Sequence, residues 1–107
     1  MLLQQVQHWK ERVMSRQDLA QFYETRPFSV HLRAEGEDVW IKLHHSTIVI
    51  STTKLASDVE LESSTPIFSK LVLGEQALYR IPKHLIKKKG PYRHLLALES
   101  LFYLPCE

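Results

Sequence analysis

The side chains with the clearest chemical character lie near the end of the sequence. Three consecutive lysines, Lys87, Lys88 and Lys89, precede an unusually apolar segment, residues 92–103. Each lysine near an anionic headgroup or membrane surface contributes about 1 kcal/mol at best. Successive residues of a strand point to opposite faces, so Lys87 and Lys89 would share one face and Lys88 the other. The lysines therefore indicate either a small anion-attracting patch or a solvated strand edge that resists aggregation.

The apolar segment predicts a helix that needs cover on two sides. Its apolar residues are Tyr92, Leu95, Leu96, Ala97, Leu98, Leu101, Phe102 and Tyr103. The polar residues left to face water are only Arg93, His94, Glu99 and Ser100. Such a wide apolar arc packs against the core and against something else. The second cover is a ligand, a second subunit or a membrane surface, and complete burial in the core is the alternative.

Other kinds of chemistry find little support in the sequence. His44 and His45 are adjacent and would face opposite ways on a strand, and the six histidines form no His-x-x-x-His pattern, so no metal site is expected. No Gly-x-Ser-x-Gly nucleophile motif occurs, and three scattered glycines cannot form a glycine-rich phosphate loop. We therefore expect no catalytic residues, no enzyme activity and no cofactor. A net charge of +2 gives no strong attraction to nucleic acid.

The cysteine content and the hydropathy predict a cytoplasmic protein. Cys106 is the single cysteine, so no internal disulfide can form, which suits a reducing compartment. Residues 1–8 lack the basic and continuously apolar regions of a signal peptide. No stretch approaches the ~20 apolar residues of a membrane-spanning helix, so any membrane contact would be peripheral.

The positions of the apolar residues predict the elements that carry these groups. Helical spacing of Leu2, Val6, Trp9 and Val13 indicates a first helix, and a short second helix is expected over 16–23. Alternation predicts strands at 28–33, 39–44, 47–53, 58–62 and 85–89, the first three joined as hairpins. A helix is expected to begin with Thr65 as its N-terminal cap and to end at Gly74. The last helix is expected to follow Gly90.

These elements predict an α+β fold in a single domain, residues 1–107. The largely antiparallel sheet would have about five strands, covered by N-terminal, middle and C-terminal helices. Trp9 falls on the inward stripe of the first helix and is expected in the core. Trp40 points away from Val39 and Ile41, so it is either an exposed interface residue or, as we expect, buried under the N-terminal helices.

The second half of the sequence resembles one family of lipid carriers. Residues 56–61 lead into a helix with Phe68 and Leu71 that ends at Gly74, then into residues 77–79 and into a strand that ends in lysines and Gly90. This order resembles the sterol carrier protein type two (SCP2-like) domain family over roughly residues 19–104.

The resemblance implies an apolar tunnel between the sheet and the helices, with the C-terminal helix as its lid. Its walls in this sequence would be Phe68, Leu71, Val72, Leu78 and Ile81, and the lid would carry Leu95, Leu98, Leu101 and Phe102. The leading hypothesis is non-enzymatic binding of a lipid or fatty acyl-like molecule, with transfer of that molecule as its extension. The alternative is a structural or assembly module that uses the last helix to form a homodimer or to bind a partner.

Overall fold

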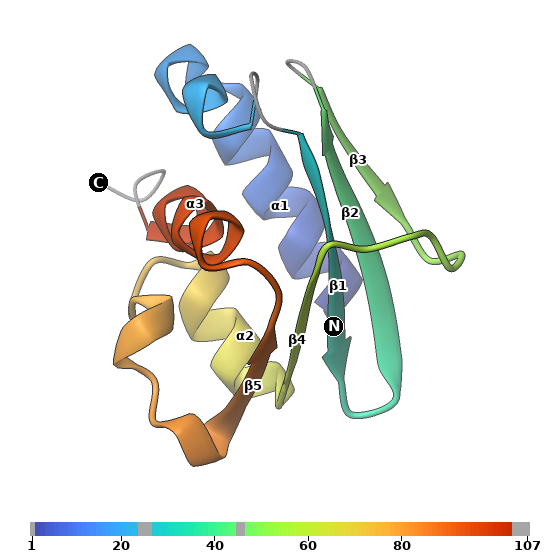
Figure 1. Ribbon diagram of the computed structural model, residues 1–107, viewed down its shortest axis with the longest axis vertical. Coiled ribbons are helices and arrows are strands. Elements are labelled where there is room, and N and C mark those ends of the chain that lie inside the picture. Colours follow the sequence, from blue (N-terminus) through green and yellow to red (C-terminus); the bar gives the residue numbers. More distant parts are fainter. Residues whose placement is uncertain (1, 24–26, 45–46, 104–107) are drawn as a thin grey trace.

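The computed structural model describes residues 2–23, 27–44 and 47–103 (Figure 1). Helix α1 (Leu2–Met14) and the 3₁₀ helix η1 (Gln17–Phe22) precede strands β1 (Phe28–Ala34), β2 (Glu37–His44), β3 (Thr47–Ser51) and β4 (Val59–Ser63). Helix α2 (Thr65–Val72), the 3₁₀ helices η2 (Leu78–Arg80) and η3 (Lys83–Leu85), strand β5 (Ile86–Lys89) and helix α3 (Tyr92–Tyr103) follow. The predicted α+β order is confirmed.

The described strands form one five-stranded sheet in the order β3-β2-β1-β4-β5. β1 lies at its centre, antiparallel to β2 and parallel to β4, and the other two pairs are antiparallel. β1 and β2 are joined by Glu35 and Gly36, whose φ angles are 50° and 85°. Two successive positive φ values match the right-handed twist of a tight hairpin, which explains the register that places Ala34 opposite Glu37.

One face of the sheet is apolar and the other is polar. The inward residues of β1, Phe28, Val30, Leu32 and Ala34, alternate with Ser29, His31 and Arg33, and β2 and β4 repeat this pattern. The described helices α1, α2 and α3 lie on the inward side of the sheet (Figure 1). The core is therefore an apolar layer between the sheet and the helices.

Local capping fixes where α2 begins and ends. Ser64, rather than the expected Thr65, is its cap, because the Ser64 hydroxyl accepts the N–H of Ile67 at 3.4 Å. The prediction was wrong by one residue because two adjacent hydroxyl residues offer equivalent caps and only the backbone angles distinguish them. Gly74 has a φ of 72° at the other end, as expected for a residue that ends a helix.

The start of α1 is held by a carboxylate from β2. Both oxygens of Glu37 accept backbone N–H groups, those of Leu2 and Leu3, at 3.1 Å each. These amides have no partner within the helix, and the negative charge also matches the positive end of the helix dipole. Glu37 therefore ties α1 to the hairpin.

Replacing Glu37 with Gln should lower the free energy of unfolding by about 1–2 kcal/mol, because one acceptor and the charge are lost. Urea denaturation would measure the change. Glu60→Gln is the matched control, since Glu60 is exposed on β4 and should change stability little. Equal effects of the two substitutions would contradict the assigned role of Glu37.

Candidate functional site

The residues predicted to line a ligand tunnel all lie in the apolar layer. They come from α2, from the segment around η2 and from α3, and they are Phe68, Leu71, Val72, Leu78, Ile81, Leu95, Leu98, Leu101 and Phe102. The most exposed of them, Leu95, has 7% of its surface accessible. None of the nine carries a charge or a nucleophile, so this layer can select a ligand only by its apolar surface and shape.

Helix α1 belongs to the same layer, although the resemblance assigned it no wall residue. The Trp9 ring lies 5.4 Å from the Phe102 ring, and its indole N–H donates to the carbonyl oxygen of Leu101 at 2.8 Å. Trp9 is fully buried, as predicted for the inward stripe of the first helix. The pairing of the first and last helices gives no local signal in the sequence, because it joins residues 92 positions apart.

Two polar atoms on α1 are buried close to this layer. Gln5 Oε1 and Arg12 Nε have no hydrogen-bond partner in the described structure. Their spacing around Trp9 places them on one side of the helix. The terminal nitrogen of Arg12 donates to the carbonyl oxygen of Val72, at the end of α2. The free Nε–H and the Gln5 amide oxygen are groups that the polar end of a ligand, or a water, could satisfy.

The inward side of α3 includes a residue that was expected to face water. His94 is only 9% exposed and stacks on Phe28, with 4.8 Å between the ring centroids. The prediction was wrong because histidine is polar by type, while its ring packs well against an aromatic neighbour. The periodicity of the sequence does not distinguish a His94 that faces water from a His94 that packs in the core.

The outward side of α3 remains exposed. Tyr92 has 65% of its surface accessible, Tyr103 41% and Leu96 38%. Tyr79, from η2, lies against this side, with its ring 5.6 Å from that of Tyr92 and its backbone N–H donating to Glu99 Oε2 at 2.8 Å. Partial burial, and then the neighbouring Tyr92 and Glu99, raise the pKa of the Tyr79 phenol. The ring therefore stays neutral at ordinary pH.

The three lysines of β5 are divided between the two faces of the sheet, as strand geometry predicts. Lys88 turns to the helical side, where its Nζ lies 4.3 Å from the centroid of the Tyr79 ring. Lys87 and Lys89 lie on the polar face, and Lys87 Nζ is 3.9 Å from Glu62. The lysines therefore form no single patch of three charges.

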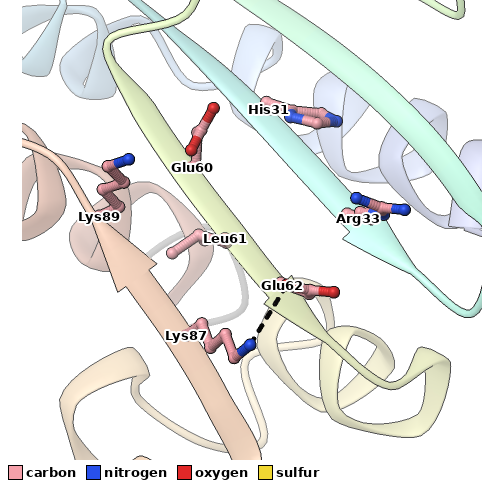
Figure 2. Close-up of a pocket in the computed structure, with 7 residues that line it drawn as sticks. All are labelled: His31, Arg33, Glu60, Leu61, Glu62, Lys87 and Lys89. Carbon is pink, nitrogen blue, oxygen red and sulfur yellow. Dashed lines mark ion pairs between the residues drawn. The ribbon is translucent and has the colours of Figure 1, made fainter.

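A shallow hollow of about 270 Å³ crosses the polar face between β1, β4 and β5 (Figure 2). Three polar stripes follow the strands here, with His31 and Arg33 on β1, Glu60 and Glu62 on β4, and Lys87 and Lys89 on β5. Opposite charges thus lie side by side across the sheet. Acidic and basic side chains alternate across the strands, and all of them except His31 are exposed, so this hollow is a weaker candidate site than the apolar layer.

Trp40 was expected to be buried under the N-terminal helices. It lies instead on the polar face of the sheet. Its ring is half-buried and stacks on His31, with centroids 4.5 Å apart and planes 5° from parallel. His31 Nε2 is 2.7 Å from Asp38 Oδ1. The expectation failed because all the covering helices pack on the other face, so Trp40 is shielded by a cross-strand neighbour instead.

Within residues 2–23, 27–44 and 47–103, no group of three or more His, Cys, Asp or Glu side chains is placed to hold a metal ion. In the same ranges, none of the helices combines the length and the apolar character needed to cross a bilayer. Cys106 lies outside the described residues.

Comparison with known proteins gives structural likeness without sequence similarity. No protein-family model matches the chain, and no curated protein matches its sequence. A crystal structure of sterol carrier protein 2 matches with a TM-score of 0.65 at 13% identity, covering 96% of this chain and 94% of that one. The ubiquinone synthesis protein UbiJ-SCP2 matches with a TM-score of 0.66 at 10% identity, covering 83% of this chain and 78% of that one.

A third match is part of a larger enzyme. The inverting sec-alkylsulfatase Pisa1 from Pseudomonas sp. aligns with a TM-score of 0.66 at 15% identity over 82% of this chain, but this chain spans only 14% of the length of the sulfatase. Identities this low establish the fold alone. The fold is SCP2-like, as the resemblance in the sequence predicted.

Proposed function

From the SCP2-like fold, we propose that this protein binds a lipid or fatty acyl-like molecule in the apolar layer between its sheet and its helices, without catalysing a reaction. The observation that carries the proposal is the structural likeness to sterol carrier protein 2 over nearly the whole of both chains. The nine predicted wall and lid residues gather in one layer that would suit an acyl chain. Transfer between membranes and a cytoplasmic location are parts of the same proposal.

The nine residues of this layer are buried, so a ligand would reach them by displacing side chains. An outward shift of α3 is one such movement, because Tyr92, Leu96 and Tyr103 on its outer side are exposed. The polar end of the ligand would then find Arg12 Nε and Gln5 Oε1, whose hydrogen-bonding capacity is unused.

Native mass spectrometry of the purified protein, followed by organic extraction, should identify a monomer that carries a lipid-like molecule. Titration with an environment-sensitive fatty-acid probe should then saturate. Leu78→Phe adds volume at a fully buried wall position and should weaken probe binding about tenfold by filling the space an acyl chain needs.

Leu2→Phe is the matched control for this prediction. Leu2 is equally buried, but it lies at the start of α1 and is not a proposed wall residue. The control should lose similar stability and bind the probe as the unmodified protein does. Absence of saturable binding, or equal weakening by both substitutions, would refute the proposal.

The second candidate function is assembly through α3. The exposed outer residues Tyr92, Leu96 and Tyr103 favour it, because apolar side chains on one helix side suit a protein interface. A ligand-free dimer in the native mass spectrum would support this candidate over the carrier.

A further inference from the structure

Three of the four tyrosines of this chain gather on one side of the molecule. Tyr92 and Tyr103 lie on α3 and Tyr79 lies beside them on η2, whereas Tyr23 is buried. Together with Leu96, these three exposed tyrosines form a surface that we call the tyrosine face. Each of its four members has at least 38% of its surface accessible.

The tyrosine face is the second apolar side of α3. Tyr92, Leu96 and Tyr103 are four and seven positions apart, a spacing that places them on one stripe of a helix. Leu98 and Phe102 occupy the opposite stripe and are buried. One helix therefore covers the apolar layer with its inner side and presents aromatic rings to the outside.

Cations surround the tyrosine face. Lys88 Nζ lies over the ring of Tyr79 at 4.3 Å, and the exposed Arg93 follows Tyr92 on α3. Arg80 and Tyr103 line the same hollow, whose volume is about 500 Å³. Two carboxylates are also close, but Glu99 is engaged by the backbone N–H of Tyr79 and only Glu75 stands exposed.

We propose that the tyrosine face docks on an anionic bilayer surface, with its rings at the level of the headgroups. Tyrosine suits that depth because its ring is apolar and its hydroxyl stays hydrated. Lys88, Arg80 and Arg93 would meet lipid phosphates there. This inference rests on the proposed function, since a carrier of a lipid-like molecule must meet a bilayer, and it assigns that contact to particular residues.

Charge favours a bilayer over a second copy of the chain as the occupant. In a symmetric dimer through this face, the ammonium group of Lys88 would be enclosed together with its own copy, and desolvating like charges is costly. An anionic surface offers these cations partners of opposite sign. With three cations, Lys88, Arg80 and Arg93, against two carboxylates, the tyrosine face is better matched to phosphate groups than to a second copy of itself.

The two neighbouring lysines of β5 provide the test. Binding of the whole chain to vesicles would be measured by co-sedimentation, with phosphatidylcholine alone and with phosphatidylcholine mixed with phosphatidylglycerol. We expect binding to the mixed vesicles only. Lys88→Gln should weaken that binding about fivefold, the loss expected for one cation at an anionic surface. Lys87→Gln removes the same charge from the opposite face of the strand and should leave binding unchanged.

A second pair of variants removes apolar side chains without changing the charge, and so tests the contribution of the tyrosine rings. Tyr92→Ser should weaken vesicle binding about tenfold, because it removes the most exposed ring of the tyrosine face. Val49→Ser is the control, since Val49 is 46% exposed on the polar face of the sheet. Both positions are open to solvent, so both variants should fold.

Equal losses for Lys87→Gln and Lys88→Gln, or no vesicle binding by the unmodified protein, would overturn the docking proposal. A dimer that Tyr92→Ser dissociates would do the same and would assign the face to a second copy. Probe titration without vesicles reports on the proposed function separately. Binding of the probe without binding of vesicles would refute only the proposed docking. Binding of vesicles without binding of the probe would refute only the proposed ligand binding in the apolar layer.

Discussion

Replacing Gly90 with alanine should lower the free energy of unfolding by about 3 kcal/mol or more, the range of strained backbones combined with steric overlap. Gly90 has a φ of 134°. A Cβ atom there would lie 2.6 Å from the carbonyl oxygen of Asp58 and 3.1 Å from the Cα of Val59. Both obstacles are backbone atoms of or next to β4, so neither can rotate away.

The position of Gly90 links this strain to the candidate site. It separates β5 from α3, and its close approach to the start of β4 sets where α3 begins. Relief of the overlap would move α3 away from the sheet.

Gly36→Ala is the control that separates strain from overlap. Gly36 also has a positive φ, 85°, but a Cβ atom there would have no neighbour within 4 Å. Its substitution should cost only about 1 kcal/mol, from the strained backbone alone. Urea denaturation of both variants would give the difference, and comparable losses would contradict the overlap at Gly90.

Replacing Trp9 with alanine should lower the free energy of unfolding by about 4 kcal/mol, as for other large buried aromatics. The substitution leaves a cavity beside Phe102 and removes the hydrogen bond to the carbonyl oxygen of Leu101. Since Trp9 joins α1 to α3, hydrogen exchange should accelerate in α3 more than in the sheet.

Two further variants separate volume from hydrogen bonding. Trp9→Phe keeps most of the ring volume and should cost about 1–2 kcal/mol, because the Leu101 carbonyl loses its donor. Trp40→Ala is the control for the ring itself, and it should cost only about 1 kcal/mol because Trp40 is half-buried on the polar face. If Trp40→Ala proved as damaging as Trp9→Ala, the assignment of the core to the helical side would be wrong.

The sequence predicted the elements and the fold class because those depend on local periodicity. Alternation along β1, β2 and β4 is a backbone property, and so is the helical spacing of Val6, Trp9 and Val13. Gly74 was predicted to end α2 for the same kind of reason, since a positive φ there requires no distant partner. The local order also resembled the SCP2-like family, and the structural likeness confirms that fold.

The nine candidate site residues were named because the resemblance to the SCP2-like family implies a tunnel at these positions, and each of them is apolar. Whether they hold a ligand remains a prediction. The sequence also indicated that the last helix has two apolar sides, and the exposure of Tyr92, Leu96 and Tyr103 on the side opposite Leu98 agrees with this.

Contacts between distant segments required the tertiary structure. Three contacts join residues that no local pattern relates. They are the parallel pairing of β4 with β1, the hydrogen bond from the Trp9 indole to the Leu101 carbonyl oxygen, and the contact between the rings of Tyr79 and Tyr92. The same is true of His94 and Trp40, whose polar or apolar type predicted the wrong surroundings. Which residues turn inward along each element could be predicted from the order of the residues, because backbone geometry fixes that alternation. Only packing decided which inward surfaces meet and which outward ones stay uncovered, because that choice minimises the free energy of the whole chain.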